Sequence, residues 1–104
     1  MRQFKVGDIV QIKSWEEMES EYELDDDGDI FVGSISRSFV KKMKYLCNVI
    51  LEVKKIEYDD DNGNTYFEEL SSGWCIYPEM VHFLDEVTKQ VLPEHKFMTI
   101  IMPL

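Results

Sequence analysis

The chain has 104 residues and a formal net charge of −10, because 21 Asp and Glu residues outnumber 11 Lys and Arg residues. A chain of this length forms one domain with a single modest core. The charge argues against direct binding to nucleic-acid phosphates or to an anionic membrane surface, and no apolar run is long enough to span a membrane.

The N-terminal stretch predicts a β-strand. A turn at Gly7-Asp8 is followed by Val10 and Ile12, which alternate with polar residues at the period of two that a half-buried strand shows. The first ten residues lack the apolar run of a signal peptide, so we expect a cytoplasmic protein.

A short helix is predicted over residues 15–24. Ser14 and Glu17 have the spacing of a capping box, in which the serine accepts a hydrogen bond from the third residue of the helix. Three apolar residues fall on one helical face: Trp15, Met18 and Tyr22. The opposite face is acidic, and between residues 14 and 36 there are nine acidic residues and no Lys or Arg.

Two acidic turns contain Asp and Gly residues in an order similar to the calcium-binding EF-hand loop, but neither fits its full pattern. Placing Gly28 at the sixth loop position puts Ser34 at the twelfth, where the EF-hand needs a bidentate Glu. In the second turn, residues 59–63, the same alignment puts Tyr58 at the first position. We therefore predict solvated turns, with no metal site and no cofactor, and opportunistic cation binding is the less favoured alternative.

A second helix is predicted from Arg37 to Cys47, capped by Ser36 or Ser38. Three apolar residues of this segment would face the core: Phe39, Met43 and Leu46. Four cations make it the basic patch of the chain: Arg37, Lys41, Lys42 and Lys44. We interpret the patch as neutralising the acidic helix within the molecule, and a nucleic-acid contact is the less favoured alternative.

Residues 49–77 predict a β-hairpin and a further strand. Apolar residues alternate from Val49 to Val53, and Ile56 and Tyr58 continue the apolar set on the opposite parity, which a β-bulge at Lys54-Lys55 would explain. Asn62-Gly63 is a strong hairpin-turn signal. The return strand covers 65–70, and a short strand follows the turn at 71–73 and stops at Pro78.

After Pro78 we expect a helical turn and a closing strand that ends near Leu84. His82 has no Ser or Cys nucleophile motif near it, so we interpret it as structural, and we expect Cys47 and Cys75 to be reduced thiols. The chain has no Gly-rich phosphate loop, metal-ligand cluster or nucleophile–base pair, so we predict no catalytic residues and no enzymatic activity. The apolar tail 96–104 predicts an extra edge strand that is covered internally or pairs with another chain, in which case residues 96–102 would form a homodimer.

Four stretches, in this order, resemble small SH3-like barrel proteins encoded by phages and mobile elements of Gram-positive bacteria: VGDIVQIKSWEEM, FVKKMKYLCN, VILEVKKIEYDDDNGNTYFEE and GWCIYPEMVHFL. The resemblance covers about residues 4–84. It implies a mainly β (α+β) fold, in which residues 1–84 form a small, partly open SH3-like barrel with two short helical insertions. Residues 85–104 would be a C-terminal extension that packs on the barrel or at a dimer interface.

Some small acidic phage proteins of this general kind inhibit host defence nucleases, including CRISPR effectors. The resemblance therefore implies an anti-CRISPR-type inhibitor whose partner is a host protein with a basic surface. Its carboxylates would imitate nucleic-acid phosphates. The expected partner-binding residues are Glu16, Glu19, Glu23, Asp25, Asp26, Asp27, Asp29, Asp59, Asp60 and Asp61. The alternative is an SH3-like adaptor that binds a partner by strand addition at the hairpin or the C-terminal edge.

Overall fold

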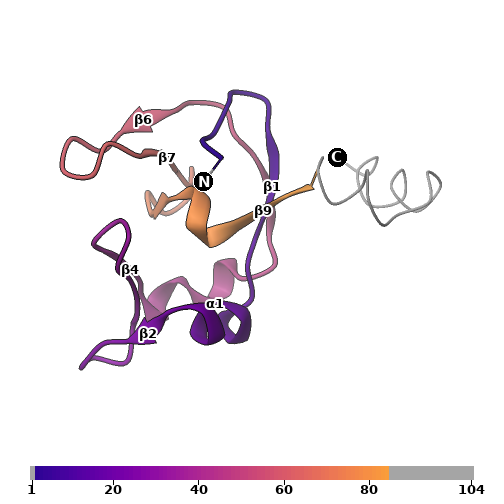
Figure 1. The fold of residues 1–104 in the computed structure, drawn as a ribbon. Coiled ribbons are helices and arrows are strands. Elements are labelled where there is room, and N and C mark those ends of the chain that lie inside the picture. The colour runs from indigo at the N-terminus through magenta and orange to yellow at the C-terminus, as the bar shows by residue number, and fades with distance from the viewer. Residues whose placement is uncertain (1, 85–104) are drawn as a thin grey trace.

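A computed structural model describes residues 2–84, which form a mainly β structure with three antiparallel sheets (Figure 1). Each sheet has three strands, and no sheet closes on itself within these residues. Two expectations concern residues outside the described part of the chain: the extension over 85–104 and the edge strand or dimer contact at 96–102. None of the described helices is long and apolar enough to cross a membrane.

The first sheet is built around strand β1 (Ile9–Ile12). Strand β5 (Ile50–Glu52) pairs with one side of β1 and strand β9 (Val81–Phe83) with the other, both antiparallel. Val10 and Ile12 are fully buried, which confirms the strand and the inward face that the alternation predicted.

Helix α1 (Trp15–Glu21) follows β1 and is shorter than the predicted helix 15–24. The Oγ of Ser14 accepts a hydrogen bond from the N–H of Glu17 at 3.0 Å, as the capping-box spacing predicted. Met18 is fully buried beneath the helix. The two remaining apolar residues of the predicted face are half-buried against the core: Trp15 and Tyr22.

The second sheet explains why α1 ends early. Strand β2 (Glu23–Leu24) pairs with β3 (Ile30–Val32), which pairs on its other side with β4 (Arg37–Phe39). Ile30 and Val32 are fully buried, so β3 is held in the core by its side chains and by ladders on both sides. These tertiary contacts outweigh the helix propensity of Glu23 and Leu24, because intrinsic propensity is small beside the energy of tertiary packing.

The prediction of a helix from Arg37 to Cys47 is wrong. Its first three residues form β4, and a 3₁₀-helix, η1 (Lys41–Leu46), follows. Met43 and Leu46 are nevertheless buried as expected, because the three-residue repeat of a 3₁₀-helix places both on one side. Phe39 pairs with Ile30 of β3, and this strand pairing keeps the start of the segment extended instead of helical.

The third sheet consists of β6 (Glu57–Tyr58), β7 (Thr65–Glu68) and β8 (Cys75–Ile76). The predicted hairpin is confirmed, and Gly63 adopts the positive φ of 72° that its turn requires. Tyr58, however, is 72% exposed, so its expected place in the apolar set is wrong. Strand β6 has only two residues and lies at the edge of the sheet, so its neighbours can cover only one side of the Tyr58 ring.

The expected β-bulge at Lys54-Lys55 is also wrong. The chain leaves the first sheet after Glu52 and enters the third at Glu57, so the change of parity marks a passage between two sheets. Val53 still has a fully buried side chain, and its N–H donates to the carbonyl of Asp8. The alternation of apolar residues therefore predicted which side chains point inward, but it did not show that the chain passes from the first sheet to the third.

Pro78–Met80 forms a short 3₁₀-helix, η2, that leads into β9, which confirms the predicted helical turn and closing strand. The three sheets share one hydrophobic core. The ring of Phe4 packs on the ring of Phe67 in the third sheet, with centroids 5.0 Å apart, and on that of Phe83 in the first sheet at 5.6 Å. The N-terminal stretch therefore joins the first sheet to the third.

Candidate functional site

The acidic turn between β2 and β3 is organised by its own hydrogen bonds. The Oδ1 of Asp25 accepts the N–H groups of Asp27 and Asp29 at 2.9 and 3.0 Å. Gly28 has a φ of +81°, and the N–H of Lys41 donates to the Oδ1 of Asp29 at 2.8 Å. Asp25 and Asp29 are half-buried and shape the turn, because each already accepts backbone hydrogen bonds.

Oxygens from three carboxylates of this turn lie within 4.8 Å of one another: Asp25, Asp27 and Asp29. Within residues 2–84 no other group of His, Cys, Asp or Glu side chains has this spacing. The backbone hydrogen bonds of the turn account for the arrangement. The ammonium group of Lys41 lies beside Gly28 and balances part of the charge.

Five of the predicted partner-binding residues of this first acidic segment are exposed and make no ion pair with a described residue: Glu16, Glu19, Glu23, Asp26 and Asp27. They come from α1, from β2 and from the tip of the β2–β3 turn. Together they form an acidic surface, hereafter the α1–β2 acidic surface, whose carboxylates are free to meet a cationic partner.

The second acidic turn, between β6 and β7, departs from the prediction at Asp59. Its side chain is buried rather than exposed. The hydroxyl of Tyr77 donates to the Oδ2 of Asp59 at 2.5 Å, and the guanidinium of Arg37 lies 2.8 Å from the same oxygen. The Oδ1 of Asp59 accepts the N–H of Asp61 at 2.9 Å. This carboxylate therefore holds the hairpin loop against other parts of the chain.

These contacts shift the titration of both partners. The hydrogen bond from Tyr77 is the main cause that lowers the pKa of Asp59 below its ordinary value of 3.8. Burial first, and then the bond to Asp59, raise the pKa of Tyr77 to about 12. The pKa of Arg37 is also raised, mainly by the hydrogen bond that Arg37 donates to Asp61. The three side chains therefore form an ion-paired structural network.

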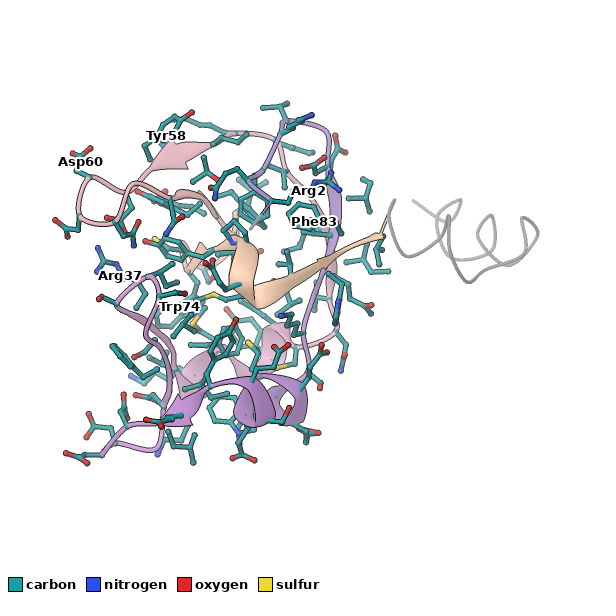
Figure 2. All side chains as sticks on the ribbon, viewed as in Figure 1. Arg2, Arg37, Tyr58, Asp60, Trp74 and Phe83 are labelled. Carbon is teal, nitrogen blue, oxygen red and sulfur yellow. The ribbon has the colours of Figure 1, made fainter. Side chains whose placement is uncertain are left out.

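Asp60 is exposed at the tip of the same loop (Figure 2). Asp61, the next residue, is also exposed. Asp60 makes no ion pair with a described residue, whereas the Oδ2 of Asp61 lies 3.0 Å from the guanidinium of Arg37. Figure 1 shows the β6–β7 and β2–β3 turns projecting toward the same side of the view, with the turn that leads into β4 between them. Arg37 lies between the two acidic turns.

The basic patch expected over residues 37–47 is divided among internal contacts. Arg37 pairs with Asp59 and Asp61, and Lys41 lies over the β2–β3 turn. The ammonium group of Lys44 lies 4.4 Å from the centroid of the Trp15 ring, a cation–π contact. Three of the four cations, Arg37, Lys41 and Lys44, are thus used within the molecule, and their partners are the two acidic turns and Trp15 and not the acidic face of α1. Lys42 is exposed and makes no ion pair with a described residue.

Sequence reasoning did not identify an open groove of about 470 Å³ between the first and third sheets, hereafter the edge groove. Its walls are β5 and β7, and residues 54, 55 and 57 also line it. Apolar surface comes from Ile50, Leu51 and Phe67, and Leu70, which is 86% exposed, stands at the rim. The groove arises where the chain passes from one sheet to the other, which no local pattern indicates.

Cys47 and Cys75 are half-buried free thiols, and burial raises the pKa of each. A raised pKa keeps a thiol protonated and weakly nucleophilic at neutral pH. His82 is half-buried and its Nε2 lies 2.7 Å from the Oε2 of Glu17, which ties β9 to α1. This contact fits the structural role predicted for His82.

In comparisons with protein-family models, curated proteins and solved structures, nothing matches this chain.

Proposed function

We propose that this protein is a non-enzymatic acidic binding protein that covers a basic, nucleic-acid-binding surface of a partner protein. The observation that carries the proposal is the α1–β2 acidic surface, where five exposed carboxylates have no cation of the described chain paired with them. Such surface carboxylates remain hydrated, and they attract cationic groups over distances comparable with the Debye length.

The internal cations support the same conclusion by their positions. Arg37 pairs with the β6–β7 loop and Lys44 contacts the Trp15 ring, so neither forms an ion pair with a carboxylate of α1. Lys13 pairs with Glu21 of α1, which lies outside the α1–β2 acidic surface. Asp60 adds a further exposed carboxylate at the second acidic turn. The buried Asp59 is removed from the proposed contact set, and Asp25 and Asp29 act by shaping their turn.

The nature of the partner follows from the resemblance described above. We propose a nucleic-acid-handling enzyme of a host defence system, such as a CRISPR nuclease, in whose basic channel the carboxylates would replace phosphates. On this proposal the three sheets are a variant of the small, partly open SH3-like barrel, and the protein acts in the host cytoplasm. Electrostatic steering would speed the encounter and make it sensitive to salt.

The test is capture of partners from host-cell lysate by the immobilised full chain at low and moderate salt, with identification by mass spectrometry. We expect a nucleic-acid enzyme that is released by salt and displaced by added DNA or RNA. The variant E19K/D26K should lose it. The matched control E86K/E94K changes the net charge equally at positions outside the α1–β2 acidic surface and should retain it.

Equal loss in both variants would show an effect of net charge alone and would contradict the proposed surface. Retention of a partner with no nucleic-acid role, insensitive to salt and to E19K/D26K, would contradict the proposal and favour the adaptor alternative. The edge groove is the observation that favours that alternative, because it lies beside a strand edge to which a peptide can add.

A further inference from the structure

The free edge of β5 borders the edge groove. In the first sheet the order is β5-β1-β9, so β5 has a partner on one side only among the described residues. The register pairs Leu51 with Val10, and the neighbouring ladder bonds run from Ile12 N–H to Val49 and from Val53 N–H to Asp8. Antiparallel hydrogen-bonded pairs alternate, so the bonds of Leu51 point to β1.

The same alternation directs the backbone N–H and C=O groups of Ile50 and Glu52 away from β1 and toward the open side. A row of such groups beside an apolar groove is a template for one more strand. Apolar side chains of β5 and β7 line the groove next to this edge, with Leu70 at its rim.

We propose that the segment 96–102 of the same chain, KFMTIIM, adds as an antiparallel strand to β5 and fills the edge groove. Chain length supports this occupant. Phe83, the last residue of β9, pairs with Val10 of β1. The described chain therefore leaves the first sheet at the end where Ile9 of β1 pairs with Glu52 of β5. A strand beyond β5 would lie three strand spacings from β9, about 14–15 Å.

The linker 85–95 has eleven residues and spans up to about 36 Å when extended, so it covers that distance with room for a turn. β9 and β5 run in the same direction, since both are antiparallel to β1. A chain that leaves β9 at this end and returns along β5 therefore runs antiparallel to β5, the arrangement that needs the shortest connection.

The chemistry of the segment also fits the groove. Residues 96–102 contain five apolar side chains, one lysine and no acidic residue, in a chain of net charge −10. Four carboxylates surround the groove against two lysines: Glu52, Glu57, Glu68 and Glu69 against Lys54 and Lys55. An acidic peptide would be repelled, whereas this segment brings a single positive charge. Alternate residues Met98, Ile100 and Met102 supply one apolar face at the strand period.

The test is residue-resolved amide hydrogen exchange of the full chain by NMR at two widely separated protein concentrations. We expect the amides of Ile50 and Glu52 to exchange at least about tenfold more slowly than unprotected amides, equally at both concentrations. The variant I100D should remove this protection, and the matched control Q90D, which adds the same charge in the linker, should keep it. The amides of Val10 and Leu51 report whether the β1–β5 ladder is intact.

The variant L70D tests the groove from its other side and should also expose Ile50 and Glu52, because an aspartate at the rim disfavours apolar packing. Unprotected amides in the natural chain would overturn the proposal. Protection that grows with concentration would assign the edge to a second copy. Protection that is unchanged in I100D would show that another partner covers the edge of β5. Each of these last two results would refute the intramolecular strand.

Discussion

Asp59 is buried, although its sequence neighbours predict an exposed, solvated residue. It stands in a run of three aspartates, and such a run indicates a solvated turn. Its carboxylate is buried because Tyr77 and Arg37, from two other parts of the chain, supply a hydroxyl and a guanidinium to one oxygen. Burial of a charge is tolerated only when such partners are present.

The network predicts how stability depends on pH. The pKa of Asp59 is lowered in the folded state, so its stabilisation is present above its ordinary value of 3.8 and is lost as the pH falls through the lower folded value. The pKa of Tyr77 is raised, so its contribution is present below 10.0 and is lost as the pH rises through about 12. Denaturant unfolding followed across both ranges measures these changes.

The variant Y77F isolates the network. We expect it to lower the melting temperature at pH 7 by about 5 °C, because it removes one hydrogen bond to a buried carboxylate. It should also flatten the loss of stability near pH 12 relative to the natural chain. The exposed tyrosine Tyr58 supplies the control, since Y58F removes a hydroxyl without touching Asp59. Identical behaviour of the two variants would contradict the network.

At the scale of elements, local signals identified where structure begins better than where it ends. The cap at Ser14 and the Asn62-Gly63 turn are confirmed, because each depends on residues within a few positions of one another. The end of α1 and the strand at Arg37–Phe39 were missed, because both depend on pairing with β3. A two- or three-residue strand carries too few side chains to show a period.

The helix cap gives a prediction at this scale. Replacing Ser14 by Ala should destabilise the protein by about 1 kcal/mol, because the N–H of Glu17 loses its acceptor. The matched control is S20A, which removes an exposed hydroxyl that donates to the carbonyl of Glu17 at 2.7 Å, leaves the cap in place and introduces a better helix former. Chemical denaturation of both variants measures the difference, and equal stabilities would show that the cap contributes nothing.

At the scale of the whole molecule, the charge distribution matters more than its sum. Cations meet carboxylates at the β6–β7 loop and near the β2–β3 turn, while the α1–β2 acidic surface has none paired with it. Repulsion among these carboxylates opposes the compact state. The acidic surface therefore carries a cost in stability that a cationic partner would relieve.

Salt should relieve the same cost. Raising the ionic strength from about 0.01 M to 0.15 M shortens the Debye length from about 30 to 8 Å, so we expect the melting temperature to rise. In E19K/D26K each reversal changes the net charge by two, so −10 becomes −6 and the rise should be smaller. Thermal unfolding followed by circular dichroism measures both, and a melting temperature independent of salt would contradict the unpaired surface.

The sequence by itself determined the mainly β class, the first strand, the hairpin and most of the inward side chains, since alternation and turn residues act over short stretches of chain. Only the tertiary structure decided that Asp59 is buried, that Arg37, Lys41 and Lys44 make internal contacts, and that an edge groove opens beside β5. Each of these features joins residues far apart in the chain, and their contacts leave no periodic signal in the sequence.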